Sequence, residues 1–159
     1  MSSDEIYSDL LGVTEKVFAE MIFTKVKGHR MEEGKNHTQD NLTGMVGFGG
    51  SITGLVSVQC TDNGAAAIAA KMLYTDEASL SQEDIRDAIG EITNMIAGGY
   101  KAIYAEKNHN GELVLEQTVP TVISGKDFET YVLGDAHRYS TIINFEGYHF
   151  MVELWIRGN

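Results

Sequence analysis

Hydrophobic residues recur at helical spacing between residues 81 and 107, and this pattern predicts one long helix. Ser81 followed by Asp84 is a capping-box sequence, in which the serine side chain accepts from an otherwise unpaired backbone N–H. The apolar positions form one narrow stripe, made of Ile85, Ala88, Ile89, Ile92, Ile96, Gly99 and Ile103. We expect this stripe to be the buried face of the helix.

The opposite face of the predicted helix carries Asp87, Glu91, Asn94 and Gly98, because each residue advances by about 100°. Glu91 and Asn94 are three residues apart, so their Cβ atoms should lie about 5–6 Å from one another. Asparagine is a mediocre residue inside a helix, and each glycine of the pair Gly98-Gly99 costs about 1 kcal/mol relative to alanine. Such local conflicts often mark functional sites, although an exposed Glu–Asn pair is more commonly a solvated surface.

Two further helices are predicted, at residues 4–25 and 64–74. Thr61 or Asp62 can cap the second of them. The side chains expected to point inward from it are Ile68, Met72 and Leu73. Residues 28–40 are polar without periodicity and predict a loop.

Strands are expected at residues 42–48, 52–60, 113–116, 119–124, 127–133, 137–145 and 148–156. Glycine-rich turns at 49–51 and 146–147 predict two hairpins, and Asn110-Gly111 is a turn signal. Pro120 favours an edge or a bulge. Hydrophobic residues alternate with other residues over 148–156, which predicts one buried face. Together these elements predict an α+β fold, a layered domain with long helices packed on a mostly antiparallel sheet.

The chain has 159 residues, of which 43% are hydrophobic and 22% charged, as expected for one domain spanning residues 1–159. Its formal net charge of −11 argues against nucleic acid as a partner and permits a partner with exposed lysines. No apolar run is long enough to insert into a membrane, and we expect no signal peptide. The single cysteine, Cys60, is expected to be buried and reduced, which is consistent with the cytoplasm.

No other sequence motif indicates a stronger candidate site. The glycines between residues 47 and 54 could be mistaken for a phosphate loop, but they join strand to strand rather than strand to helix. The five histidines are scattered without the spacing of metal ligands, so no metal site is predicted.

Residues 87–98, DAIGEITNMIAG, resemble the E-x-x-N motif of the CheC/CheX/FliY phosphatases of bacterial chemotaxis. Residues 47–56 are similar to the first hairpin of that family, and residues 120–125 to a later strand segment of its CheX branch. With the matching order of elements, the resemblance covers about residues 6–156. CheC and FliY carry two such motifs and CheX one. Since residues 4–22 contain no asparagine, the chain resembles a CheX-like member with a CheC-like fold.

This resemblance implies a phosphatase that hydrolyses the aspartyl phosphate of a CheY-type response regulator in chemotaxis or two-component signalling. Asn94 would insert into the regulator and orient the attacking water, and Glu91 would pair with a regulator lysine. Asp87 and Gly98 would contact the same partner. The resemblance also implies a homodimer joined through sheet edges. The chain would bind no cofactor of its own, because the Mg²⁺ belongs to the phosphorylated regulator.

A second hypothesis from the same residues is a binding module without catalysis. The helix face of Glu91 and Asn94 could dock a response regulator or a flagellar-switch protein without hydrolysing anything. Both residues of the motif are present, which favours the enzyme.

Overall fold

The computed structural model describes residues 1–31, 41–109, 115–125 and 134–158. The helices of this part are α1 (Ser3–Ile22), α2 (Asp62–Leu73) and α3 (Gln82–His109), with a short 3₁₀ turn η1 (Glu77–Ser79) between the last two. The strands are β1 (Lys27–Arg30), β2 (Leu42–Gly49), β3 (Ile52–Cys60), β4 (Glu116–Gln117), β5 (Thr121–Ser124), β6 (His137–Phe145) and β7 (Tyr148–Gly158).

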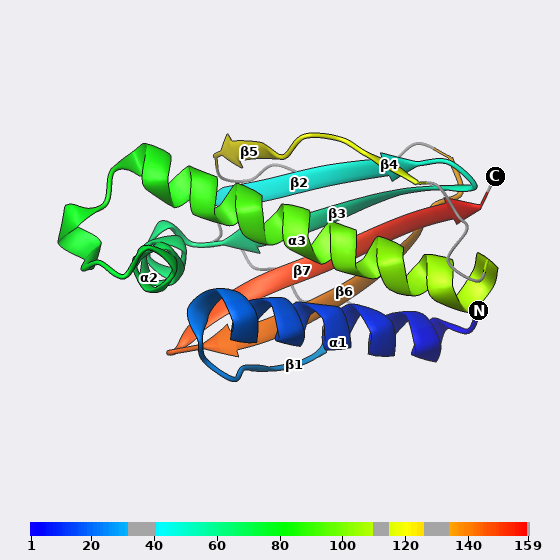
Figure 1. Cartoon of the computed structure of the whole chain (residues 1–159), viewed down its shortest axis with the longest axis horizontal. Coiled ribbons are helices and arrows are strands. Elements are labelled where there is room, and N and C mark those ends of the chain that lie inside the picture. Colours follow the sequence, from blue (N-terminus) through cyan, green and yellow to red (C-terminus); the bar gives the residue numbers. More distant parts are fainter. Residues whose placement is uncertain (32–40, 110–114, 126–133, 159) are drawn as a thin grey trace.

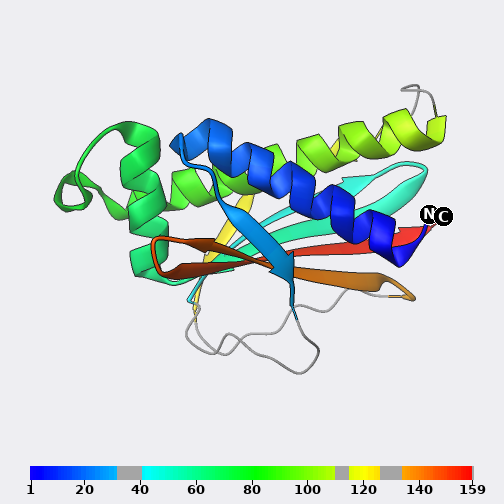
Figure 2. The same ribbon diagram turned by 90° about the horizontal axis from the view of Figure 1, so that it is seen from below.

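The strands form one seven-stranded sheet in the order β1-β6-β7-β3-β2-β4, and β5 also pairs with β2. All of these pairings are antiparallel. The three helices lie on one face of the sheet, with α1 and α3 crossing it and α2 at one end (Figure 1 and Figure 2). This arrangement confirms the predicted α+β fold of long helices on an antiparallel sheet.

Local sequence signals account for the helix starts. Ser81 and Asp84 bond reciprocally, each backbone N–H donating to the other side chain at 3.0 Å, so the predicted capping box is present. Thr61, rather than Asp62, caps α2 by accepting from the backbone N–H of Gly64 at 3.0 Å. Helix α1 ends at Ile22 instead of extending to residue 25, because Phe23 adopts the left-handed conformation at φ 55°.

The two predicted hairpins are confirmed. β2 pairs with β3 and β6 with β7 along their lengths. The second turn has positive φ at both Glu146 and Gly147, which matches the right-handed twist of the flanking strands. These hairpins supply the central strands under the helices.

The core lies between the helices and the sheet. The predicted stripe of α3 is its centre, with Ile89, Ile92 and Ile96 fully buried. Tyr100 is also buried, and its hydroxyl has no hydrogen-bond partner among the described residues. Burial raises the pKa of this phenol, and the carboxylate of Asp9 raises it further.

The predicted loop over residues 28–40 is wrong at its start, where Lys27–Arg30 forms strand β1. This segment has no alternating pattern and is ordered by its neighbours. It pairs with β6, and its Gly28 N–H donates to Glu15 of α1 at 3.0 Å. Residues 32–40 lie outside the described part of the chain.

Two expectations about burial are also wrong. Leu73 is 52% exposed because it ends α2 beside the left-handed cap Tyr74. The hairpin of β7 does not have a single buried face, since Met151 and Glu153 on the side away from the helices are buried too. The Glu153 carboxylate is satisfied there by Arg138 and by the Ser140 hydroxyl.

The predicted strands around Pro120 are present but shifted, as Glu116–Gln117 and Thr121–Ser124. Helix α3 continues to His109, past the start of the predicted turn at residues 108–111. The turn signal at residues 110–111 and the predicted strand at 127–133 lie outside the described residues.

Candidate functional site

The candidate site is the face of α3 turned away from the core. Asp87 and Glu91 are exposed, Asn94 is half-buried, and Gly98 follows one turn further on. Within the described residues, neither carboxylate takes part in an ion pair or a hydrogen bond. Two negative charges therefore stand open to solvent beside an amide, as the helical spacing predicts.

Packing on the opposite side sets the rotation of α3. The buried Thr93 hydroxyl donates to the Ile89 carbonyl at 2.7 Å. Gly44 of β2 faces these two residues so closely that a Cβ there would lie 2.4 Å from the Thr93 Oγ1. A side chain at Gly44 would push the helix away, so this glycine lets α3 approach the sheet. With Thr93 held inward, the adjacent Asn94 is directed to the helix flank.

Asn94 is less open than the sequence suggests, because Gln117 of β4 binds it. The Gln117 Nε2 donates to the Asn94 Oδ1 at 2.6 Å and to the Asn94 backbone carbonyl at 3.1 Å. Sequence reasoning missed this partner. The contact spans 23 positions, and the strand predicted at 113–116 ends just before Gln117. Knowledge of the pairing of β4 with β2 would have been needed to find it.

The strand pairing of β4 holds Gln117 in place. Gln117 pairs with Phe48 of β2. The next residue is fixed twice, since the Thr118 N–H donates to the Gly47 carbonyl at 2.8 Å and the Gly47 N–H donates to the Thr118 hydroxyl at 2.9 Å. The side chain that binds Asn94 is thus carried by sheet rather than by an unsupported loop.

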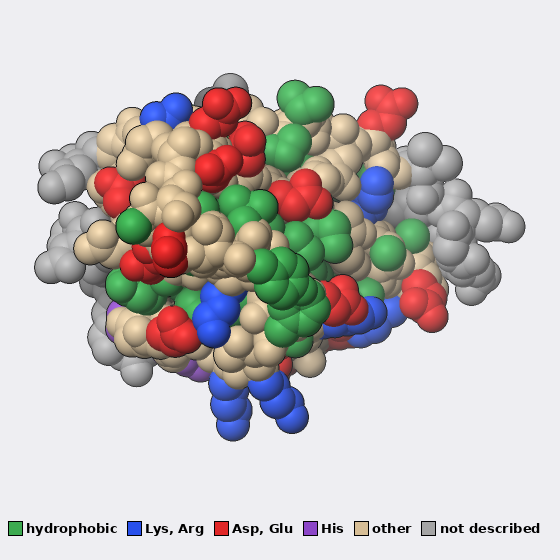
Figure 3. Space-filling view, turned by 60° about the vertical axis from the view of Figure 1, so that its left-hand side comes forward, with side chains coloured by type: hydrophobic (Ala, Val, Ile, Leu, Met, Phe, Trp, Pro, Cys, Tyr) green, Lys and Arg blue, Asp and Glu red, His purple; other side chains and the backbone are tan. Residues whose placement is uncertain are grey.

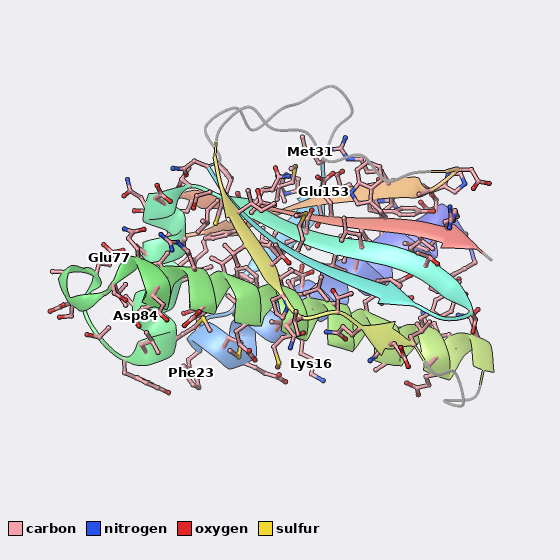
Figure 4. The ribbon with its side chains drawn as sticks, turned by 90° about the horizontal axis from the view of Figure 1, so that it is seen from above. Lys16, Phe23, Met31, Glu77, Asp84 and Glu153 are labelled. Atoms are coloured by element: carbon pink, nitrogen blue, oxygen red, sulfur yellow. The ribbon has the colours of Figure 1, made fainter. Side chains whose placement is uncertain are left out.

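A groove of about 600 Å³ opens beside Asn94, between α1 and α3. Its apolar lining includes Val13, Val17, Met95 and Ile103, and its polar lining includes Lys16, Glu20, Asn94 and Gln117. In Figure 4, Lys16 projects from α1 on the side of the helix layer away from the sheet. Apolar walls with a few polar groups at the edge are typical of a binding groove.

Exposed aromatic side chains lie at the C-terminal ends of α1 and α2. Phe23 and Tyr74 are 67% and 79% exposed, and their ring centroids are 5.6 Å apart. Figure 3 brings this end of the molecule forward and shows hydrophobic side chains gathered on it. Phe23 projects on the same side of α1 as Lys16 (Figure 4).

Other kinds of site have little support in the described residues. Among them, no group of three or more His, Cys, Asp or Glu side chains is placed to hold a metal ion. The glycines of residues 47–50 lie at the end of β2 and in the turn to β3, so they join strand to strand, as predicted, and do not precede a helix. None of the described helices is both long and apolar enough to cross a membrane.

Comparison with solved structures defines the class of protein. A CheC-like superfamily protein from Shewanella sp. PV-4 has a TM-score of 0.80 and 22% identity, covering 99% of this chain and 100% of its own. CheX from Vibrio vulnificus has a TM-score of 0.77 and 23% identity, covering 96% and 97%. CheX in the CheX–CheY–BeF₃–Mg²⁺ complex from Borrelia burgdorferi has a TM-score of 0.71 and 19% identity, covering 98% of both chains. The fold is therefore CheC-like.

The family follows from the sequence itself. Residues 42–144, which include the helix with Glu91 and Asn94, match the family model described as chemotaxis phosphatase CheX. The chain belongs to this family, as the motif at residues 87–98 predicts. No curated protein sequence matches the chain.

Proposed function

We propose that this chain hydrolyses the aspartyl phosphate of a CheY-type response regulator, with Asn94 positioning the attacking water and Glu91 docking the partner. The observation that carries the proposal is the geometry of α3. An exposed carboxylate without an ion pair in the described residues stands one turn from a hydrogen-bonded amide at the edge of a groove. Membership of the CheX family and the likeness to a CheX solved in complex with CheY support this class of partner.

Hydrolysis of an aspartyl phosphate requires few catalytic groups from the phosphatase. An acyl phosphate already has a good leaving group, so hydrolysis mainly requires a well-placed water and stabilised charge. The neutral amide of Asn94 can donate to a water and accept from it without adding charge near the phosphoryl group. No nucleophile or covalent intermediate on this chain is required.

Glu91 supplies docking rather than chemistry in this proposal. Its open carboxylate pairs with a lysine of the regulator and sets the register of the complex through a charge-assisted hydrogen bond. Asp87, one turn earlier, extends the negative surface toward the same partner. Gly98 keeps the helix surface low at the groove, which allows the partner backbone to approach closely.

The remaining parts of the proposal concern the assembly. The chain contributes no metal, and the Mg²⁺ needed for turnover is held by the regulator. Two copies associate through sheet edges, where β1 lies at one edge of the described sheet and β4 and β5 lie at the other. Chemotaxis and two-component signalling place the reaction in the cytoplasm.

The test is a turnover assay with CheY-type receiver domains from the source organism, each phosphorylated with acetyl phosphate. Substoichiometric chain is added with Mg²⁺, and phosphate release is followed. Asn94→Ala should lower kcat by about 10²–10³ and leave KM nearly unchanged, because the amide acts in the transition state. Asn94→Asp should lose rate and also bind more weakly, since it places a negative charge near the phosphoryl group.

Melting curves serve as the control for folding in both variants. Within the described residues, the side chain of Asn94 takes part in one hydrogen bond, which it accepts from Gln117, so the fold should survive its replacement. A folded Asn94→Ala chain with the full wild-type rate would overturn the proposal. Receiver binding by the wild type without any phosphate release would instead favour the docking module.

A further inference from the structure

We infer that Gln117 is a positioning residue that locks the amide of Asn94 in one orientation, with its NH₂ group presented to the bound partner. The inference rests on the proposed function, because it assigns how the catalytic amide is held. It adds a residue from β4 to a site otherwise carried by α3.

The orientation follows from donor and acceptor chemistry. The Asn94 backbone carbonyl can only accept, so the Gln117 atom 3.1 Å from it must be the donor Nε2. The same Nε2 lies 2.6 Å from the Asn94 side chain. A donor requires an acceptor there, so that atom is Oδ1 and the Asn94 Nδ2 lies on the other side of the amide. Two hydrogen bonds from one nitrogen thus select one of the two amide orientations.

The surroundings are built to keep this arrangement. Gln117 is carried by the pairing of β4 with Phe48 of β2, and Thr118 anchors the strand beyond it. Gly98 lies beside the glutamine, since a Cβ there would be in ordinary contact with the Gln117 Oε1 at 3.7 Å. Asn94, Gln117 and Gly98 all line the same groove, so the locked amide stands at its edge.

The consequence for catalysis is preorganisation. An amide free to rotate would present its oxygen or its nitrogen to the partner, and only one of these suits a given water and phosphoryl geometry. Held through Oδ1, Asn94 presents two N–H donors and retains one lone pair on the oxygen. The entropy lost on fixing the orientation of the Asn94 amide is lost during folding, so it does not add to the barrier of the reaction.

The test compares Gln117→Leu, which cannot donate, with Gln117→Glu, which can donate only when protonated. In the receiver-domain assay, Gln117→Leu should lower kcat by up to about 100-fold with KM nearly unchanged. Gln117→Glu should be impaired at neutral pH, because its carboxylate would turn the Asn94 amide around. Its kcat relative to wild type should rise as the pH falls from about 7.5 to 5, toward the ordinary glutamate pKa of about 4.3. Glu116→Ala, an exposed neighbour on β4, is the control with wild-type rate.

The double variant Asn94→Ala with Gln117→Leu should be no slower than Asn94→Ala alone, because Gln117 acts through Asn94. A folded Gln117→Leu chain with wild-type kcat, when Asn94→Ala has lost its rate, would overturn this inference and leave the proposed function standing. Full activity of Asn94→Ala would overturn the proposed function itself. If Gln117→Leu melts early, Gln117→Glu decides, and a pH-independent ratio counts against the inference.

Discussion

Helices α1 and α3 cover the same face of the sheet and share a local feature. In each, a buried threonine donates its hydroxyl to the carbonyl four residues earlier, Thr14 to Leu10 and Thr93 to Ile89, both at 2.7 Å. If the two threonines are aligned, Gly12 and Glu15 of α1 take the positions of Glu91 and Asn94 in α3. The helices are thus similar on the buried side and differ in the residues directed outward.

The flank of α1 contacts β1 at one edge of the sheet, and the flank of α3 contacts β4 at the other edge. The two contacts differ in kind. Glu15 of α1 accepts from the Gly28 backbone N–H of β1, and Asp4 of α1 binds Arg30 of the same strand at 2.6 Å. Asn94 of α3 is bound by the Gln117 side chain of β4. The polar flank of α1 is therefore used to hold an edge strand, whereas α3 keeps an oriented amide and an open carboxylate. Under the proposed function, this difference assigns the active face to α3 and not to α1.

After the Asn94 and Gln117 variants, the largest effect that tests this difference is expected from reversing the charge of Glu91. Glu91→Lys should raise KM for the phosphorylated receiver about tenfold or more, because it replaces attraction to a partner lysine by repulsion. The effect should diminish at high ionic strength. Steady-state kinetics across a range of salt concentrations measure both.

The matched variant on α1 is Gly12→Lys, at the position aligned with Glu91. A Cβ at Gly12 meets nothing within 4 Å, so the lysine is accommodated. It should leave KM unchanged. The two variants change the net charge by +1 at Gly12 and +2 at Glu91. A KM effect of Gly12→Lys that is about half that of Glu91→Lys in free energy would therefore mean that docking responds to overall charge and not to the face of α3.

The sequence predicted those features that depend on local patterns. Ser81 and Asp84 identify the start of α3 because a capping box involves residues three positions apart. The outward position of Glu91 follows from helical periodicity for the same reason. The hairpin at Glu146-Gly147 was predictable because its turn residues adjoin the strands that they connect.

Features that depend on distant pairing were not predictable. Strand β1 has no hydrophobic alternation and is ordered by β6 and by Glu15. The hydrogen bond that orients Asn94 requires β4 to pair with β2. This pairing brings Gln117 to Asn94, which lies 23 positions earlier in the chain. The burial of Glu153 likewise depends on Arg138 and Ser140 across the hairpin. In each case the deciding partner belongs to another element.

A second comparison concerns the adjacent glycines of α3, which face different neighbours. A Cβ at Gly99 would lie 2.7 Å from the Val13 Cγ1 of α1, whereas one at Gly98 would be in ordinary contact with Gln117. Alanine improves helix propensity at either position by up to about 1 kcal/mol. Overpacking against the stiff valine costs about 1–3 kcal/mol. Gly98→Ala should therefore stabilise the chain and Gly99→Ala should destabilise it.

Urea unfolding of the two alanine variants beside the wild type measures this difference in free energy of unfolding. Because both variants replace glycine by alanine within the same helix, the gain in helix propensity is common to both and cancels in the comparison. Stabilisation by both alanines would show that α1 moves aside freely, so that the close approach of Val13 to Gly99 is not required.

The smallest expected effect concerns the ion pair that joins the end of α3 to the start of α1. The Lys107 Nζ lies 2.8 Å from the Asp9 carboxylate and 3.3 Å from that of Glu5. The hydrogen bond to Asp9 raises the pKa of Lys107. The stabilisation is therefore complete at neutral pH and is lost as the pH rises through this raised pKa, above the ordinary lysine value of about 10.4.

Lys107→Met should lower the melting temperature only slightly, because exposed ion pairs contribute little and are screened by salt. The loss should disappear at high ionic strength and at a pH above the lysine pKa, where the wild type has lost the pair as well. Lys101→Met is the matched control, since Lys101 lies on the same helix and forms no ion pair within the described residues. Because α1 and α3 are also joined by the packing of Val13 on Gly99, neither methionine should alter turnover of the phosphorylated receiver. Equal melting shifts for the two variants would mean that the link between the helices is carried by packing alone.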